Sequence, residues 1–245
     1  MPNSHRLERP PLSLVRTNPR YPAALRACPG PIAPAAITAL GDLALLDCRP
    51  LALFCSARCP GSLIVQASDL AHALRDHGAA VIGGFHTPVE RACLEILLGG
   101  AGPLIVCPAR GMYKIIPAEF RKPLADGRLL LLSPFDETEH RVTVELAAGR
   151  NRFVAALASR VLFVHSAPGG RTEALAREVV GWGKPIYTLK HAGNSYLLAL
   201  GAAPMPADGA GQPEITTAHS HPVKSTNEHC DAPALPEKDD IQWKP

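Results

Sequence analysis

The chain has 245 residues, of which 47% are hydrophobic but only 5% aromatic, and its formal net charge is +3. No apolar run reaches the roughly 18 residues of a membrane span, and residues 1–10 lack the apolar centre of a signal peptide, so we expect a cytoplasmic protein without membrane contact. The seven cysteines, an odd number spread through apolar segments, fit reduced thiols better than a disulfide framework.

The first 50 residues are rich in proline and alanine, and residues 21–42 (YPAALRACPGPIAPAAITALGD) are their most regular part. Repeated prolines interrupt both helices and strands. Residues 1–50 are therefore predicted to form a lead-in of short helices and turns that packs on the following domain and does not fold independently.

Short apolar runs alternate with amphipathic stretches from Leu51 onward. The predicted strands are residues 51–55, 79–82, 103–107, 128–132, 160–165 and 185–189. The predicted helices are residues 66–77, 88–98, 143–158 and 172–182. The strands are continuous apolar runs, as expected when helices cover both faces of a parallel sheet. Residues 51–202 are therefore predicted to form an α/β domain, with a doubly wound, mostly parallel Rossmann-like sheet and helices on both faces.

Residues 203–245 contain prolines and small polar residues without periodicity, which predicts a disordered tail. The tail holds seven acidic residues and three lysines, so the preceding residues hold 22 basic and 15 acidic residues, a net charge of about +7. Eighteen of those 22 basic residues are arginine, whose planar fork matches phosphate bidentately. This composition favours a polyanionic or nucleotide partner, although a solvated surface explains it equally.

The turns that follow the predicted strands bring glycine, hydroxyl and arginine side chains to one edge of the sheet. Ligands of such sheets bind beyond the carboxyl ends of the strands, where helix N-termini point free N–H groups outward. We therefore predict a phosphate-binding site at this edge, although glycine in such a turn is also ordinary loop chemistry. Its candidate residues are Ser56, Arg58, Gly83, Gly84, Arg110, Gly169, Gly170, Arg171 and Thr172.

The segment GRNRFVAALA places Arg150, Asn151 and Arg152 inside the third predicted helix. These side chains join the phosphate site only if the helix breaks near Gly149, which glycine and asparagine would permit. The other interpretation is a solvated helix face on which Glu145 pairs with an arginine.

The segment RNRFVAALASRVLFVHSAPGGRTEALA resembles the RNR-I-AGLS, V-V-EA and SG-L-TA motifs of the DprA (Smf) family of DNA-processing proteins. Other segments follow in the family's order. YPAALRACPGPIAPAAITALGD resembles its lead-in, FCSARCPG its VGSR turn, VIGGFHTPVERACLEILL its SGGA-GID--AH--AL motif, and NSYLLALGA its closing N-LI--GA motif. These collinear matches cover residues 18–202, and their order makes the assignment specific.

The resemblance implies an extended Rossmann domain that binds single-stranded DNA in a basic pocket, forms a homodimer and loads a RecA-type recombinase during natural transformation or recombination. By position, Arg58 corresponds to the phosphate-binding arginine of the family's first turn, and Gly83 and Gly84 to the glycines of its second turn. The family's RNR triplet corresponds to Arg150, Asn151 and Arg152, and its YP--N--L loop to the segment with Lys114, Arg121 and Lys122.

The chain departs from the family pattern in three places. The aspartate and histidine of GID--AH are absent, and Pro88, Glu90 and Cys93 occupy that neighbourhood. The SG-L-TA motif is GGRTEA here, and the tail stands where the family has a winged-helix domain. We therefore expect a stand-alone, divergent member of the family.

The segment PGGRTEALARE also resembles the PGG-GT--E signature of the nucleotide-cleaving family known for cytokinin activation and mislabelled as lysine decarboxylases. The segment is one residue short, so Leu175 lies three residues after Thr172, and Glu173 and Glu178 are out of phase. An N-glycosidase needs a carboxylate against the ribose, and a shift of one helical residue turns a side chain by about 100°. A nucleotide-binding sensor or a nucleoside-monophosphate N-glycosidase is the alternative to DNA binding.

We predict structural roles for the remaining cysteine and histidine residues of the domain. Cys55 and Cys59 have no second pair at metal-binding spacing, and buried thiols are the expected arrangement. His86 and His165 lie at strand ends, where hydrogen-bonded structural roles are common, and Ser56 has no base near it in sequence. We expect no metal, no cofactor and no catalysed reaction, and we assign no metal to the tail residues His219, His221, His229 and Cys230.

Overall fold

The structure is a computed structural model that describes residues 10–27, 33–206 and 209. All of these residues belong to one compact unit, residues 1–212. Apart from residues 203–206 and 209, the predicted tail lies outside the described residues.

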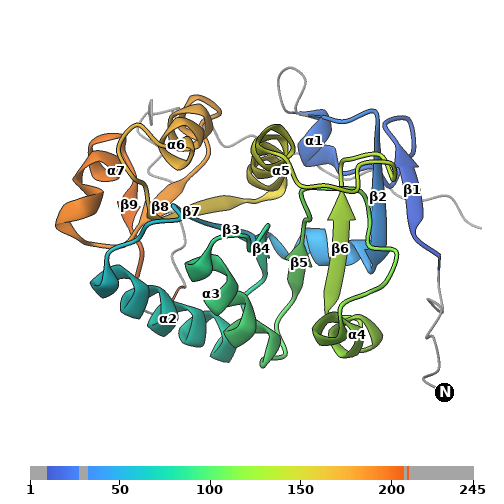
Figure 1. The fold of residues 1–245 in the computed structure, drawn as a ribbon, viewed down its shortest axis with the longest axis horizontal. Coiled ribbons are helices and arrows are strands. Elements are labelled where there is room, and N and C mark those ends of the chain that lie inside the picture. Colours follow the sequence, from blue (N-terminus) through green and yellow to red (C-terminus); the bar gives the residue numbers. More distant parts are fainter. Residues whose placement is uncertain (1–9, 28–32, 207–208, 210–245) are drawn as a thin grey trace, which may run out of the picture. The chain divides into compact units, whose positions relative to one another are not determined.

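The described residues form a nine-stranded sheet in the order β1-β2-β6-β5-β4-β3-β7-β8-β9 (Figure 1). From β6 to β9 neighbouring strands are parallel, whereas β1 and β2 are antiparallel to their neighbours. The predicted mostly parallel α/β sheet is thus confirmed. The strands are Leu12–Val15 (β1), Ala36–Gly41 (β2), Leu51–Cys55 (β3), Val81–Gly83 (β4), Leu104–Val106 (β5), Leu129–Ser133 (β6), Arg160–His165 (β7), Ile186–Thr188 (β8) and Ala203–Pro204 (β9).

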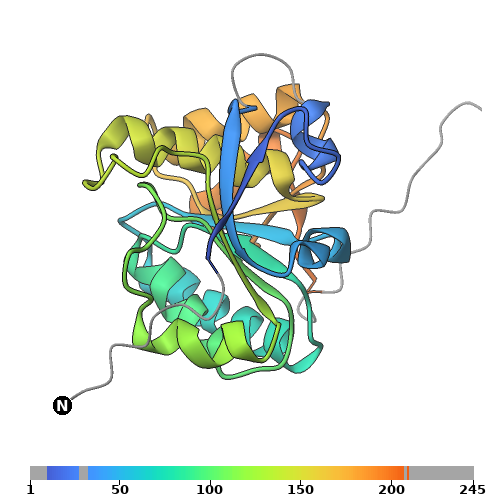
Figure 2. The same ribbon diagram turned by 90° about the vertical axis from the view of Figure 1, so that its right-hand side faces the viewer.

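Helices cover both faces of the sheet (Figure 2). They are Ala23–Arg26 (α1), Gly61–Asp76 (α2), Pro88–Leu98 (α3), Ala118–Ala125 (α4), Val144–Leu157 (α5), Arg171–Gly181 (α6) and Ser195–Ala199 (α7), with 3-10 turns at Leu43–Cys48 and Ala192–Asn194. One face packs α1, α5, α6 and α7 through side chains such as Phe153 and Leu175. The other face packs α2, α3 and α4 through side chains such as Leu63 and Val89. The doubly wound arrangement with helices on both faces is therefore present.

The predicted elements between residues 51 and 189 are all present, with ends that shift by up to five residues. The first 50 residues differ from the expectation of short helices and turns, because β1 and β2 extend the sheet beyond β6. Proline and alanine give this segment a low intrinsic preference for strands. It forms strands because it pairs antiparallel with the rest of the sheet, for example Leu40 with Leu131.

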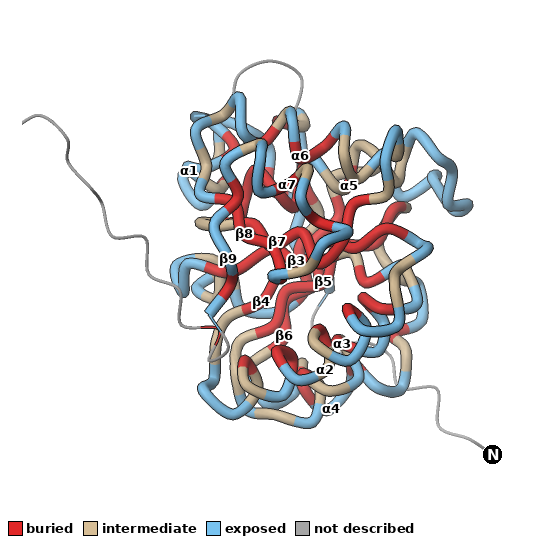
Figure 3. Tube along the Cα trace, turned by 90° about the vertical axis from the view of Figure 1, so that its left-hand side faces the viewer, coloured by how far each residue is buried: buried red, intermediate tan, exposed pale blue. Residues whose placement is uncertain are grey.

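The carboxyl ends of β3 and β7 form the topological switch point of the sheet. The two strands are neighbours, yet β3 leads into α2 on one face and β7 leads into α6 on the other. Both strands are buried along nearly their whole length, and the tube is red there in Figure 3. Ligands of open α/β sheets bind in the crevice at such a point. None of the described helices is long and apolar enough to cross a membrane.

Candidate functional site

Ser56 joins the two turns of the switch point. Its N–H donates to the carbonyl oxygen of His165 (3.0 Å), and its Oγ accepts from the N–H of Ala167 (2.9 Å). The residue is only 7% exposed. Ser56 therefore fixes the turn after β3 against the turn after β7, and Arg58 stands on that fixed turn.

Arg58 and Arg171 are the exposed cations of these two turns. Arg58 follows β3, and Arg171 is the first residue of α6. Neither side chain makes a hydrogen bond or an ion pair with a described residue. Both guanidinium groups are therefore available to an anionic ligand at the carboxyl edge, although the charge of Arg171 also contributes to lowering the pKa of Glu145.

The turn after β4 is tightly folded around two glycines. A Cβ on Gly83 would lie 2.9 Å from the ring of Phe85, and the carbonyl oxygen of Gly83 accepts from the N–H of Cys107. Phe85 is buried and has a φ of 48°, in the left-handed region that costs a bulky residue conformational energy. Such strained turns persist only where the surrounding contacts hold them.

Glu90 makes several of the hydrogen bonds that keep this turn in place. Its side chain is buried, and its Oε1 accepts from the N–H of Cys55 (2.9 Å). Its Oε2 accepts from the N–H groups of His86 (2.8 Å) and Thr87 (3.3 Å). One carboxylate thus connects the end of β3 to the turn after β4. Glu90 was not among the residues predicted for the site, although the spacing of Thr87 and Glu90 at the start of α3 is the signature of a capping box.

Arg150 reaches the carboxyl edge from the middle of an unbroken α5. The helix does not break at Gly149, since α5 runs continuously from Val144 to Leu157, and Arg150 meets the turns after β4 and β5 from this unbroken helix. Nη1 of Arg150 donates to the carbonyl oxygen of Cys107 (3.0 Å), and Nε donates to Oδ1 of Asn151 (2.7 Å). A Cβ on Gly84 would lie 1.6 Å from Nη1 of Arg150. Glycine is therefore required for the guanidinium to lie against this turn.

The charged side chain of Arg150 is almost completely buried. The residue is 3% exposed, and burial lowers its pKa, while the Glu90 charge and the nearby Cys107 and Tyr113 oppose that change. Burial raises the pKa of the Cys107 thiol to about 12, and Arg150 opposes that shift. Nη2 of Arg150 makes no hydrogen bond with a described residue. Arg150 therefore keeps the turns after β4 and β5 together and has one donor nitrogen left.

Arg152 lies apart from Arg150 although only one residue separates them. Nε of Arg152 donates to both carboxylate oxygens of Glu178 on α6, at 2.9 and 2.8 Å. This pair is partly exposed on the helical layer. The structure therefore divides the predicted triplet, with Arg150 and Asn151 at the carboxyl edge and Arg152 in an ion pair between α5 and α6.

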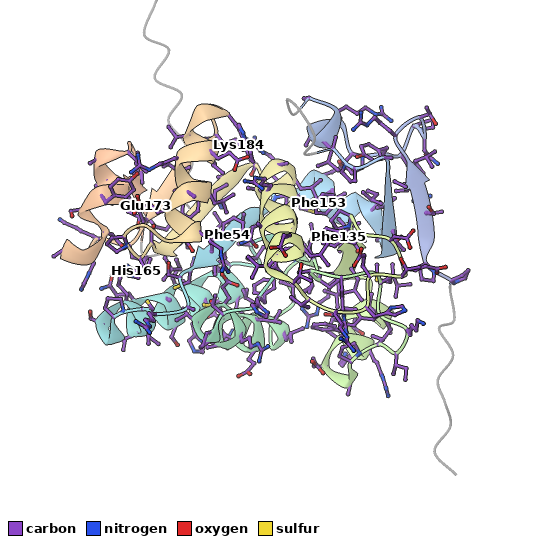
Figure 4. All side chains as sticks on the ribbon, turned by 45° about the horizontal axis from the view of Figure 1, so that its top comes forward. Phe54, Phe135, Phe153, His165, Glu173 and Lys184 are labelled. Atoms are coloured by element: carbon purple, nitrogen blue, oxygen red, sulfur yellow. The ribbon has the colours of Figure 1, made fainter. Side chains whose placement is uncertain are left out.

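The glycine turn after β7 is already engaged with a carboxylate. Gly169 has a φ of 68°, which favours glycine, and its N–H donates to Oε2 of Glu173 (2.9 Å). Oε1 of Glu173 accepts from Arg177 (3.0 Å). The N–H of Gly170 donates to the carbonyl oxygen of Ala167, and Thr172 is half-buried in the first turn of α6. The side chains of His165 and Glu173 can be followed in Figure 4.

The histidines near the switch point hold structural hydrogen bonds. The amide nitrogen of Asn194 donates to the carbonyl oxygens of Val164 and Leu189, so its Oδ1 accepts from Nδ1 of His165 (2.9 Å). Nδ1 of His191 accepts from the N–H of Gly193, so the proton of the neutral ring is on Nε2, which lies 3.1 Å from Oγ of Ser62. The ring therefore donates to Ser62 and does not serve as a base for it.

A group of His, Cys, Asp and Glu that could hold a metal is absent from the residues that the structure describes. Cys55 is buried, and burial raises the pKa of its thiol above the ordinary range. Cys59 is partly buried beside the same core. The His and Cys residues of the tail lie outside the described residues.

Residues 13–210 match the family model described as DNA recombination-mediator protein A. The chain belongs to this family. It is similar to the DNA processing protein A (DprA) of Streptococcus pneumoniae, with a TM-score of 0.68 and 18% identity over 81% of this chain and 71% of that one. It is also similar to the DprA of Helicobacter pylori, with a TM-score of 0.64 and 22% identity over 82% of this chain and 91% of that one. No curated protein sequence matches the chain.

The segment between β5 and the end of α4 carries several cations, and only some of them already have a partner within the chain. The guanidinium of Arg110 lies 4.8 Å from the centre of the Tyr113 ring, a cation–π contact that leaves its edge open. Lys114 is exposed and makes no hydrogen bond or ion pair with a described residue. Arg121 donates to the carbonyl oxygen of Ile116, and Lys122 of α4 pairs with Asp126, the C-cap residue of that helix. Lys114 and the open edge of the Arg110 guanidinium are therefore available to a ligand, whereas Arg121 and Lys122 already have partners.

In the neighbourhood where the DprA motif has an aspartate and a histidine, Cys93 is buried in the core. It is 1% exposed, and its Sγ donates to the carbonyl oxygen of Ala67 (3.7 Å), which joins α3 to α2. Cys93 is therefore a core side chain here, while Glu90 provides a carboxylate that organises the backbone around it.

Proposed function

We propose that this member of the DprA family binds single-stranded DNA along the carboxyl edge of its sheet, without catalysing a reaction and without a cofactor. The observation that carries the proposal is a row of exposed cations on neighbouring turns. In sheet order they are Lys114 after β5, Arg58 after β3, Arg171 after β7 and Lys190 after β8, and the exposed His86 follows β4 within the same row.

The length of this row favours an oligonucleotide over a single nucleotide. The five strands are consecutive in the sheet, so four strand spacings of ~4.8 Å separate the first turn from the last, about 19 Å in all. That span exceeds what one mononucleotide phosphate can contact and suits a basic track that follows several phosphates of a strand. The similar DprA of H. pylori binds single-stranded DNA, which supports the same ligand here.

The carboxylates near the glycine turn support a binding role over N-glycosidase chemistry. Glu173 is bonded to the N–H of Gly169 and to Arg177, and Glu178 is bonded to Arg152. A glycosidase carboxylate must face the ribose of the substrate. Both candidate carboxylates are occupied by internal partners, and we propose that neither acts on a nucleotide.

The experiment that tests the proposal is a binding titration by fluorescence anisotropy. Labelled single strands of increasing length, a duplex and AMP as competitor are compared at two salt concentrations. We expect the affinity to increase from a mononucleotide to a strand of about ten bases and to fall with salt, because each bound phosphate releases counterions. An affinity that saturates at one nucleotide would establish the nucleotide sensor instead, and release of free base from AMP would establish the glycosidase.

We further propose that the chain acts as a homodimer that delivers single-stranded DNA to a RecA-type recombinase, with a role in DNA uptake or recombination. The support is membership of the family described as DNA recombination-mediator protein A. Light scattering measures the mass of the particle in solution. Recombinase assembly on DNA coated with single-strand-binding protein, with and without this chain, measures the loading activity. A monomer that leaves assembly unchanged would overturn this part of the proposal.

A further inference from the structure

The carboxylate of Glu173 lies against the turn that leads into α6. The N-cap residue is Gly170, which has no side chain to accept from the free N–H groups of the turn. Free N–H groups at the start of a helix are a common site for phosphate. In this chain, the carboxylate three residues into the helix folds back, and Oε2 accepts from the N–H of Gly169 at 2.9 Å. An internal anion therefore stands at the turn.

The carboxylate of Glu173 is fixed in this position. Its side chain is 13% exposed, and Oε1 accepts from Nη2 of Arg177 at 3.0 Å. The guanidinium of Arg177 lies 4.8 Å from the centre of the Tyr196 ring, which holds it over α7. The hydrogen bonds from Arg177 and from Gly169 lower the pKa of Glu173, so the group is ionised at neutral pH. The negative charge is thus permanent under physiological conditions.

We propose that Glu173 is a specificity-determining residue that excludes ligand phosphates from the backbone of the β7–α6 turn. A phosphate at Gly169 would replace the carboxylate as acceptor and would be repelled by its charge. The strand is therefore held in this region by the exposed side chain of Arg171 and by the turn that carries Arg58, not by the glycine N–H groups. This inference rests on the proposed binding of nucleic acid at the carboxyl edge.

The test compares Glu173→Ala and Glu173→Gln with the wild-type chain in binding a labelled 20-base single strand. Glu173→Ala frees the N–H of Gly169 and removes the repulsion, so we expect about fivefold tighter binding through one more charge-assisted contact. The slope of log K against log salt should become more negative by about 0.7, the value for one additional phosphate of a single strand. Glu173→Gln removes the charge but keeps an acceptor, and we expect a smaller gain in affinity.

Glu95→Gln is the matched control. Glu95 is an exposed residue of α3 that makes no ion pair with a described residue, so this change gives the same net charge as Glu173→Gln. It should change the affinity less than twofold. An equal gain in Glu95→Gln would show that overall charge, not the turn, produces the effect and would overturn the proposal. If Glu173→Ala lowers the melting temperature but leaves the affinity unchanged, Glu173 serves only to stabilise the start of the helix. That result would also overturn the proposal.

A second measurement does not depend on DNA binding. Inorganic phosphate is titrated into ¹⁵N-labelled protein while the amide signal of Gly169 is followed. We expect a saturable shift of this signal in Glu173→Ala and none in the wild-type chain. An equal shift in both proteins would overturn the role of Glu173. Failure of the wild-type chain to bind any oligonucleotide would remove the proposed function, while this titration would still decide whether Glu173 excludes phosphate.

Discussion

The guanidinium of Arg150 lies directly on the backbone of Gly84, so close that a Cβ on the glycine would be 1.6 Å from Nη1. The two residues come from α5 and from the turn after β4, and a third partner, the carbonyl oxygen of Cys107, holds Nη1 in place. Arg150 is buried, so its side chain has little room to move aside. This contact connects the helical layer to the carboxyl edge, where the proposed site lies.

Gly84→Ala should therefore lower the free energy of unfolding by about 1–3 kcal/mol, through overpacking and the loss of a buried hydrogen bond. The same change in an Arg150→Ala background should cost less, with a coupling energy of about 1 kcal/mol or more. Urea titrations of the four proteins of this cycle measure both values. Gly61→Ala is the control, because a Cβ at Gly61 meets nothing within 4 Å. Additive costs would show that the two residues do not act together.

Glu90 gives the second prediction, because its carboxylate accepts from the backbone at the end of β3 and from the turn after β4. Glu90→Ala leaves those buried N–H groups unpaired and should cost about 3 kcal/mol of stability, measured by urea titration. Glu90→Gln keeps one acceptor oxygen and should cost less. Thr87→Ala, which removes only the N-cap of α3, should cost about 1 kcal/mol.

The affinity for single-stranded DNA distinguishes a local role of Glu90 from a role in the site. Glu90 holds the N–H of Cys55, which directly precedes the turn that carries Arg58. Glu90→Gln should weaken DNA binding, whereas Thr87→Ala should leave it unchanged within twofold. Equal affinities for the two variants would limit Glu90 to the stability of the fold.

The sequence predicts the central fold because the parallel strands are continuous apolar runs whose pattern is independent of context. β3, β5 and β7 are buried on both faces, and apolar side chains at nearly every position specify them. β1 and β2 could not be predicted in this way, because the short segment LSLV and the sequence AITALG become strands through antiparallel pairing with each other and with β6. β9 and the buried Met205 likewise extend the sheet past the expected boundary at residue 202.

The sequence also places the turns of the candidate site at one edge but does not determine what their side chains contact. Arg150 and Arg152 have identical side chains two positions apart, and only the position of α5 over the sheet shows that one is buried and the other is exposed. The glycine turn PGGRTE is typical of a phosphate site, yet the side chain of Glu173 bends back toward this turn and its carboxylate binds the N–H of Gly169. Helix position and rotamer are tertiary properties, which residue spacing does not encode.

The buried thiols give a prediction about stability at alkaline pH. Burial raises the pKa of Cys93 and of Cys107 from an ordinary value of 9.0 to about 12. A group with a raised pKa in the folded state stabilises the fold below its unfolded pKa and loses that contribution as pH rises toward the folded value. Stability should therefore fall between pH 9 and 12. Urea titrations at about pH 8 and pH 10 should show a loss about 2 kcal/mol larger in the wild-type chain than in Cys93→Ala/Cys107→Ala.

The last prediction concerns the arginines at the carboxyl edge and uses Arg152 as the internal comparison. Arg58 and Arg171 are exposed and have no hydrogen-bonded partner among the described residues, whereas Arg152 is bonded to Glu178. Arg58→Ala/Arg171→Ala should weaken binding of a 20-base single strand at least tenfold and flatten the salt slope by about 1.4, because two phosphate contacts are lost. Arg152→Ala removes a partly exposed ion pair and should change the affinity less than twofold. Fluorescence anisotropy at several salt concentrations measures both effects. If Arg152→Ala weakens binding as much as the double variant does, the strand crosses the surface of α5 and α6 and not the turns of the sheet. Because all of these arginine side chains are at least partly exposed, circular dichroism should show unchanged folding, so a loss of affinity reports the path of the strand.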